Sequence, residues 1–95
     1  LLDEDYVLEI IEISEFAGKS KNRQSILKAR IIGTKGKAKK KIEVDCDVKI
    51  SVYGKTVSII GKWENVNLAR ESVEKLLSGS EHSSVYRFLD EKKII

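Results

Sequence analysis

Two glycines separated by two polar residues, Gly33-Thr34-Lys35-Gly36, lie between two stretches whose residues favour helices. A turn of this kind has little side-chain bulk, so it joins the two helices at a tight corner. The second helix then begins at the turn, where its first amide N–H groups lack partners and its dipole favours negative charge. Lys35 and Lys37 stand beside these amides. The turn therefore predicts a site that binds phosphate groups.

The basic residues are concentrated around this turn. The chain carries 18 basic and 15 acidic residues, for a net charge of +3. Ten of the basic residues fall in a segment without a single acid: Lys19, Lys21, Arg23, Lys28, Arg30, Lys35, Lys37, Lys39, Lys40 and Lys41. This segment predicts one strongly positive surface, which attracts polyanions, on an otherwise acidic body. A solvated helix face would also carry lysines, but it does not explain why acids are absent from the whole stretch.

The first half of the chain reads as a strand followed by a helix. With 95 residues, the chain has room for one small domain and one core. Apolar and β-branched residues at positions 6–14 predict a strand, and the polar segment 15–22 predicts a loop. Ser20 or Asn22 could cap a helix over 23–32, which Gly33 ends.

The second half predicts a helix, a hairpin, another helix and a tail. A basic helix starts at Gly36, and the segments 48–53 and 56–60 alternate as two strands around a Gly54-Lys55 turn. Gly61 to Glu64 is expected to be a connection, with Asn65 as the N-cap of the next helix and Gly79 as its stop. That helix has the clearest apolar period, carried by Val66, Ala69, Val73, Leu76 and Leu77.

This order predicts an α+β fold. It has a three-stranded antiparallel sheet with three helices on one face, in the order β-α-α-β-β-α, plus a short C-terminal helix. Lys49, Ser51 and Tyr53 are expected on the open face of the sheet. We divide the chain into a domain over residues 1–79 and an amphipathic tail over residues 80–95, with Val85, Phe88 and Leu89 on the apolar face of the tail.

The loop and its surroundings resemble a type I KH domain. The residues that carry the resemblance are Ile31 to Gly36, the basic helix ending in Lys41-Ile42-Glu43, and the strand that starts with Val48-Lys49-Ile50. The similarity covers about residues 6–79 and includes the order of the elements. It implies a non-catalytic module that binds single-stranded RNA and clamps about four nucleotides with the GxxG loop.

A narrower resemblance points to one group of KH proteins. The segments Arg30 to Gly36, Ile50 to Thr56, Asn67 to Glu71 and Gly79 to Leu89 look like the C-terminal KH domain of archaeal relatives of "partner of Nob", a small-subunit ribosome assembly factor. This resemblance implies binding to the 3′ region of small-subunit ribosomal RNA and a preceding KH domain, which fits a chain that starts without Met. The alternative is a protein-interaction module whose GxxG surface and C-terminal tail dock an endonuclease or an initiation factor.

The resemblance also assigns the RNA-binding residues. Amides at the start of the second helix, with Lys35, Lys37 and Lys40, would hold phosphates. Ile32 and Ile50 would form the floor of a groove for bases, and ordinary core packing is the alternative for both. Backbone groups around Ile50 would read the base edges. The full predicted set is Arg30, Ile32, Gly33, Thr34, Lys35, Gly36, Lys37, Lys39, Lys40 and Ile50. Lys39 stands where many KH domains have an apolar residue, so we expect looser base selectivity.

The remaining reactive residues predict no catalysis. Cys46, the only cysteine, rules out an internal disulfide and fits a reducing cytoplasm; we expect it to be buried at a helix end. His82 has no Cys or His nearby in sequence that could share a metal, and we expect a surface or capping residue. Trp63 is expected to pack under the third helix; the alternative is an exposed ring that stacks on a base. We therefore expect no enzyme activity, no cofactor, no metal and no membrane segment.

Overall fold

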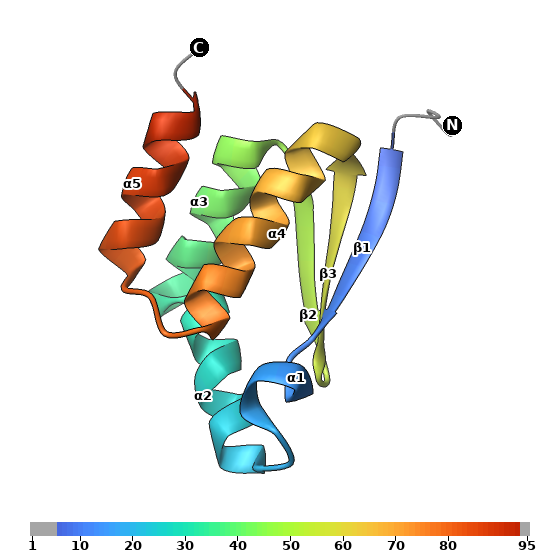
Figure 1. Cartoon of the computed structure of the whole chain (residues 1–95), viewed down its shortest axis with the longest axis vertical. Coiled ribbons are helices and arrows are strands. Elements are labelled where there is room, and N and C mark those ends of the chain that lie inside the picture. The colour runs from blue at the N-terminus through green and yellow to red at the C-terminus, as the bar shows by residue number, and fades with distance from the viewer. Residues whose placement is uncertain (1–5, 94–95) are drawn as a thin grey trace.

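A three-stranded antiparallel sheet forms one layer of the protein, which we describe over residues 6–93 of a computed structural model. Its strands are β1 (Tyr6–Glu12), β2 (Lys49–Tyr53) and β3 (Thr56–Lys62), in the spatial order β1-β3-β2 (Figure 1). The central strand β3 pairs Ile60 with Leu8 of β1 on one side and with Lys49 of β2 on the other. Both β1 and β2 are therefore edge strands within the described residues.

Helices form the second layer. They are α1 (Ser14–Ala17), α2 (Lys21–Ile32), α3 (Lys37–Cys46), α4 (Trp63–Leu77) and α5 (His82–Lys93), with a single 3-10 turn, Thr34–Gly36, between α2 and α3. The four longer helices lie on one side of the sheet, and α5 lies beside α3 and α4, away from the strands (Figure 1). The predicted α+β fold with a three-stranded antiparallel sheet is confirmed.

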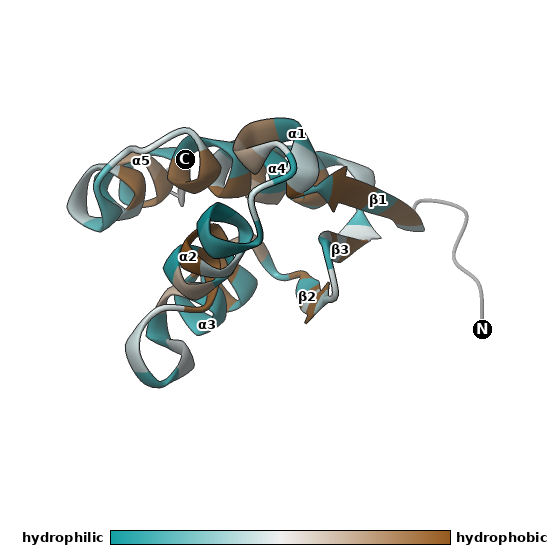
Figure 2. Ribbon diagram, turned by 90° about the horizontal axis from the view of Figure 1, so that it is seen from below, coloured by the Kyte–Doolittle hydropathy of each residue, from teal (hydrophilic) through white to brown (hydrophobic). Residues whose placement is uncertain are grey.

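The core lies between the two layers. Its fully buried apolar side chains come from every part of the chain, and among the largest are Ile13, Ile31, Ile42, Ile59, Leu76 and Leu89. The open face of the sheet carries Lys49, Ser51 and Tyr53, as predicted, but also the exposed Leu8 and Ile10. Val7 and Ile11 face the core from the other side of β1, so the strand is apolar on both faces and is coloured as hydrophobic in Figure 2.

Several element boundaries differ from the sequence predictions. Residues 15–22 are not all loop, because Ser14–Ala17 forms the short helix α1. Ser20 is the N-cap of α2, and its side-chain oxygen accepts the N–H of Arg23 at 3.2 Å. The predicted connection at Gly61–Glu64 is wrong. Strand β3 runs to Lys62 and α4 begins directly at Trp63, so Asn65 lies inside the helix and caps nothing.

The packing prediction for Trp63 is also wrong. Trp63 is 61% exposed as the first residue of α4. The predicted stop at Gly79 agrees with the structure. Helix α4 ends at Leu77, and Gly79 has φ of +107°, where its N–H reaches the carbonyl of Leu76 at 3.3 Å.

The C-terminal helix α5 folds back onto the domain that we predicted to end at Gly79. Val85 and Leu89 are fully buried in the same apolar cluster as the sheet, and Phe88 packs at its edge. The ammonium of Lys75 on α4 lies 4.9 Å from the centre of the Phe88 ring, a favourable cation–π contact. The apolar face of the tail is thus used in folding.

Candidate nucleic-acid interface

The GxxG turn needs glycine at its first position for close packing. Gly33 has φ of +77°, and a Cβ atom built there would lie 2.7 Å from the Cβ and 2.8 Å from the backbone nitrogen of Ala38. Such distances are too short for any other residue, so Gly33 lets α2 and α3 approach each other. Gly36 also has a positive φ, +76°, but a Cβ there would meet open space. The two glycines therefore serve different purposes.

The tip of the turn projects into solvent. Thr34 and Lys35 are both exposed. Lys35 adopts the left-handed conformation, with φ of 56° and ψ of 28°, which is uncommon for a residue with a side chain. Because both residues at the tip are exposed, a sugar-phosphate backbone could approach the turn closely.

The start of α3 is electrostatically open to an anion. No side chain caps this helix, and its first turn contains no acidic residue. The turn itself provides two local bonds, from the N–H of Gly36 to the carbonyl of Gly33 at 3.2 Å and from the N–H of Lys37 to the carbonyl of Thr34. Lys37 and Lys40 are exposed and form no salt bridge with any side chain that the structure describes. Amides, helix dipole and lysines thus favour negative charge at one place.

A groove runs between α3 and the edge strand β2. Its volume is about 370 Å³, and its lining includes Lys39 and Glu43 from α3 and Lys49, Ile50 and Ser51 from β2. Ile50 is 4% exposed, so it forms part of the floor as well as part of the core. Ile32, predicted to share this floor, is half-buried at the end of α2 and is not among the residues that line the groove.

Glu43 is a groove residue that the sequence analysis did not single out. Its Oε2 atom accepts the backbone N–H of Ile50 at 2.8 Å and the ammonium of Lys39 at 3.3 Å. The i, i+4 spacing of Lys39 and Glu43 could have indicated the ion pair. The contact with Ile50 depends on how α3 sits against β2, which the sequence does not show.

Other predicted residues lie on the opposite side of α3, toward α5. Arg30 donates from Nε to the carbonyl of Leu76 at 2.9 Å and from a terminal nitrogen to the carbonyl of Ser80. His82 Nε2 lies 2.8 Å from the carbonyl oxygen of Arg30, so the first turn of α5 is fixed to the last turn of α2. The expectation that His82 is a surface or capping residue is replaced by this half-buried contact.

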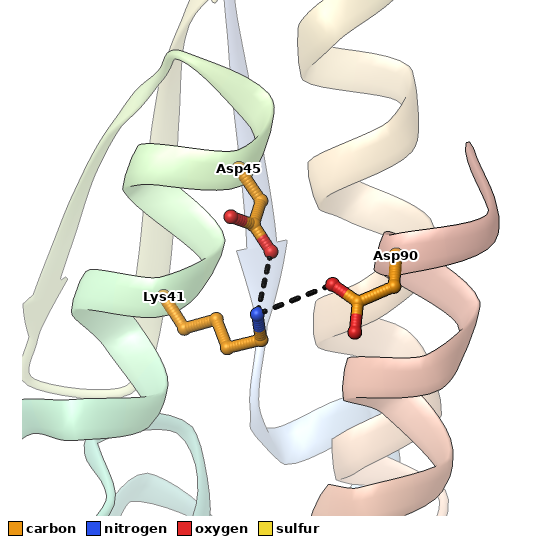
Figure 3. Close-up of polar contacts among 3 residues, drawn as sticks. All are labelled: Lys41, Asp45 and Asp90. Atoms are coloured by element: carbon orange, nitrogen blue, oxygen red, sulfur yellow. Dashed lines mark hydrogen bonds and ion pairs between the residues drawn. The ribbon is translucent and has the colours of Figure 1, made fainter. Parts of the chain in front are cut away.

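Lys41 is also used within the protein. Its ammonium donates to Asp45 at 2.9 Å and reaches Asp90 of α5 at 3.4 Å (Figure 3). The hydrogen bond to the Asp45 carboxylate is the largest cause of a raised pKa for Lys41, and Asp90 adds to it. The ammonium also lies 5.5 Å from the centre of the Tyr86 ring. Lys41 therefore joins α3 to α5.

The predicted RNA-binding set is thus spread over two surfaces and the turn and helix between them. Lys39 and Ile50 face the groove beside β2. Arg30, Gly33, Thr34 and Lys37 border a depression on the α5 side, together with Ile26, Ala29, Ala38, His82 and Tyr86. Lys35, Gly36 and Lys40 lie on neither lining and sit at the tip of the turn and on α3.

Cys46 is another reactive group that the sequence analysis considered. Cys46 is 2% exposed at the end of α3, as predicted, and burial followed by the nearby charge of Asp45 raises the pKa of its thiol to about 12. Within residues 6–93, no three His, Cys, Asp or Glu side chains gather as metal ligands would. The helices in this range are also too short or too polar to cross a membrane.

Comparison with known proteins identifies the class. A family model described as "Eukaryotic type KH-domain (KH-domain type I)" matches residues 7–94, which is nearly the whole chain. The chain belongs to the type I KH domain family, and the resemblance seen in the GxxG turn is confirmed.

Individual relatives define the group more narrowly. A KH domain-containing protein of Methanocaldococcus jannaschii, MJ0443, is 43% identical over 98% of this chain and 40% of its own length. The pre-rRNA-processing protein PNO1 of Chaetomium thermophilum is 40% identical over 63% of this chain and 23% of its own length. These relatives, with the Dim2p structure described next, confirm the similarity to the "partner of Nob" group.

Two solved structures share the fold closely. The Aeropyrum pernix protein APE0754 superimposes with a TM-score of 0.92 at 36% identity, over 96% of this chain and 48% of that one. The Dim2p protein of Pyrococcus horikoshii, solved in a complex with a/eIF2alpha and rRNA, gives 0.87 at 41% identity, over 97% and 49%. The chain therefore spans about half the length, or less, of the relatives that it matches.

Proposed function

We propose that this chain is a non-catalytic RNA-binding module that recognises the 3′ region of small-subunit ribosomal RNA during ribosome biogenesis. The observation that carries the proposal is the intact GxxG turn at the uncapped start of α3, surrounded by lysines without salt-bridge partners among the described side chains. The Dim2p relative, which was solved with rRNA, supports the choice of ligand.

Phosphate groups would bind at the turn. KH modules clamp about four nucleotides with this loop. Lys35, Lys37 and Lys40, together with the amides at the start of α3, would neutralise phosphates and position the strand without reading its sequence. The bases would then turn toward the groove between α3 and β2, which lies on the next turn of the same helix. Arg30, which donates to protein carbonyls, is less available for RNA than the sequence suggests.

The alternative function, docking a protein through the C-terminal tail, has less support from the structure. Val85 and Leu89 are fully buried and Phe88 is half-buried, so the apolar face that favoured this hypothesis is already covered. A protein partner such as an endonuclease or an initiation factor would have to contact other residues of α5 or another surface.

Fluorescence anisotropy tests the proposed ligand. The chain would be titrated with a short single-stranded RNA carrying the 3′-end sequence of small-subunit ribosomal RNA, and with a scrambled RNA of the same composition. We expect tighter binding to the 3′-end sequence, and affinity that falls steeply with salt because counterions are released from neutralised phosphates. Equal affinity for both RNAs would mean that the chain binds phosphates without sequence preference, and it would contradict the proposed recognition of the 3′ region of ribosomal RNA. Absence of binding would reject the RNA-binding proposal.

A further inference from the structure

The outward-facing N–H of Ile50 is occupied by an acidic side chain. Strand β2 has β3 on one edge only, so the N–H of Ile50 points away from the sheet and toward α3. In a KH groove, a backbone group at this place would be expected to bond to a base edge. Here Glu43 Oε2 accepts that N–H at 2.8 Å, so the carboxylate takes the place of a base acceptor.

This contact changes which base the groove can accept. A base that bonds to Ile50 through a ring nitrogen acceptor, as adenine or cytosine would, must first displace the Glu43 carboxylate. Because Glu43 is only 20% exposed, displacement takes one of two donors from a partly buried carboxylate and leaves it with Lys39 alone, which would weaken binding by a factor of roughly 5 to 150. The groove thus disfavours the bases that a free N–H would select.

The groups that remain available form a different pattern. A carboxylate has about four lone-pair positions and a lysine ammonium has three donors. Glu43 uses part of its capacity on Ile50 and Lys39, and Lys39 uses one donor on Glu43. The groove edge therefore presents acceptors with a donor beside them. Among the four RNA bases, only guanine offers the complement on its Watson–Crick edge, since N1–H and the N2 amine donate side by side while O6 accepts.

We infer that Glu43 and Lys39 together read a guanine in the groove beside β2. The Glu43 carboxylate accepts from guanine N1–H and N2–H while it keeps its bond from Ile50, and the Lys39 ammonium donates to O6. This inference rests on the proposed RNA binding at the GxxG turn. It gives Lys39 a role in base selection, whereas the sequence suggested that this lysine loosens selectivity.

The position of the pair fits a strand that is held at the turn. Lys39 follows Gly36 by three residues, which is a rise of about 4.5 Å along the helix. A phosphate bound at the start of α3 and a base bound by Lys39 and Glu43 can thus belong to neighbouring nucleotides. The exposed Ile60, which also lines the groove, offers an apolar surface for the base.

Anisotropy titrations with simple RNAs test the inference. The probes are oligouridines of about eight nucleotides, long enough to shift register over the four that a KH module holds. One probe carries only uridine, and the others carry a single guanosine, inosine, adenosine or cytidine near the middle. We expect the guanosine probe to bind at least about 5-fold tighter than the others, as for a good bidentate contact. Inosine, which lacks the N2 amine, should lose a large part of this advantage.

Variants of the chain separate base reading from RNA binding. Glu43→Gln keeps an oxygen for the N–H of Ile50 but presents one acceptor, so the preference for guanosine should disappear. Lys39→Met should reduce the preference in a second, independent way. Lys40→Met, on the exposed side of α3, should weaken all probes by the same factor. Circular dichroism melts check that each variant is folded.

The outcomes distinguish this inference from the proposal on which it rests. If the wild-type chain binds every probe equally, with affinity that falls with salt and is lost in Thr34→Asp/Lys35→Asp, then RNA binding holds and guanine reading is overturned. A guanosine preference that survives both Glu43→Gln and Lys39→Met also overturns it. If no probe binds at all, the RNA-binding proposal itself fails, and the guanine site fails with it.

Discussion

Lys40 and Lys41 are neighbours in the sequence, but they lie in two regions of the molecule with different properties. Lys40 is exposed on α3 below the GxxG turn and forms no salt bridge among the described side chains. Lys41, one residue later, bonds to Asp45 and Asp90 and holds α5 against α3 (Figure 3). The 100° step between residues of a helix is enough to turn one lysine to solvent and the next to a neighbouring helix.

The GxxG turn and the surface beside α5 also differ in whether the protein itself provides partners for the polar side chains. At the turn, Lys35 and Lys37 surround an uncapped helix start, and we propose that RNA phosphates provide their partners. Beside α5, Arg30 donates to the backbone carbonyl of Leu76, and the His82 ring bonds to the backbone carbonyl of Arg30 on α2. Both side chains therefore already have partners in the protein. A run of ten basic residues thus predicts a positive surface, but only the fold determines which charges remain available to a ligand.

The largest expected effect is a loss of stability when a core side chain of α5 is truncated. Leu89→Ala removes a fully buried side chain from the core and should lower the free energy of unfolding by about 2–5 kcal/mol. Chemical denaturation monitored by circular dichroism measures it. The matched control is Val44→Ala on the exposed surface of α3, which should change stability by no more than about 0.5 kcal/mol. Equal effects of the two substitutions would mean that α5 does not pack as described.

Substitutions at the tip of the GxxG turn should lower RNA affinity strongly and change stability little. Thr34→Asp/Lys35→Asp removes one lysine and places two negative charges where phosphates are proposed to bind. RNA affinity should fall by at least about 100-fold, which corresponds to two lost charge-assisted contacts. Stability should hardly change, because Asp tolerates the left-handed conformation of Lys35 better than most residues. An RNA titration and a thermal melt of the same sample measure both quantities, and retained RNA affinity would locate the site elsewhere.

A comparison of the two glycines sharpens the account of the turn. Gly33→Ala adds a methyl group within 2.7 Å of Ala38 in a positive-φ conformation, so it should cost about 2–4 kcal/mol of stability. Gly36→Ala meets only the backbone penalty of about 1–2 kcal/mol, because its Cβ would lie in open space. Denaturant titrations of both variants test the difference. A larger loss for Gly36→Ala would contradict the packing role assigned to Gly33.

The sequence predicted the GxxG turn and the order of the strands and the four longer helices, but not the short helix α1, because the predicted features depend on local signals. The apolar period of α4, the Ser20 cap and the paired glycines are each readable within a few residues. The start of α4 was predicted wrongly since Asn65 resembles a cap, whereas the chain passes from β3 into the helix at Trp63 without any side-chain cap.

Contacts between distant segments could not be predicted in the same way. Arg30 and His82 are 52 positions apart, and Glu43 reaches the N–H of Ile50 only because α3 packs beside the edge of β2. The resemblance therefore places Arg30 among the RNA-binding residues, although its side chain bonds to carbonyls of the protein. The structure distinguishes Arg30 and Lys41, which bond to the protein, from Lys35 and Lys40, for which the described side chains include no salt-bridge partner.

The most direct test of this account is the salt dependence of RNA binding in Lys40→Met and Lys41→Met, measured together with their melting temperatures. Each phosphate contact on a single strand contributes a slope of about 0.7 in log affinity against log salt. Lys40→Met should lower the slope by about this amount and leave the melting temperature nearly unchanged.

Lys41→Met should instead lower the melting temperature by roughly 4–8 °C, for a loss near 1 kcal/mol, with a smaller change in slope. Since the pKa of Lys41 is raised above its ordinary 10.5, this stabilisation is present at neutral pH and is lost only as the pH rises through the folded-state pKa. If Lys41→Met lowered the slope as much as Lys40→Met and left the melting temperature unchanged, the division of charges between RNA and fold would be wrong.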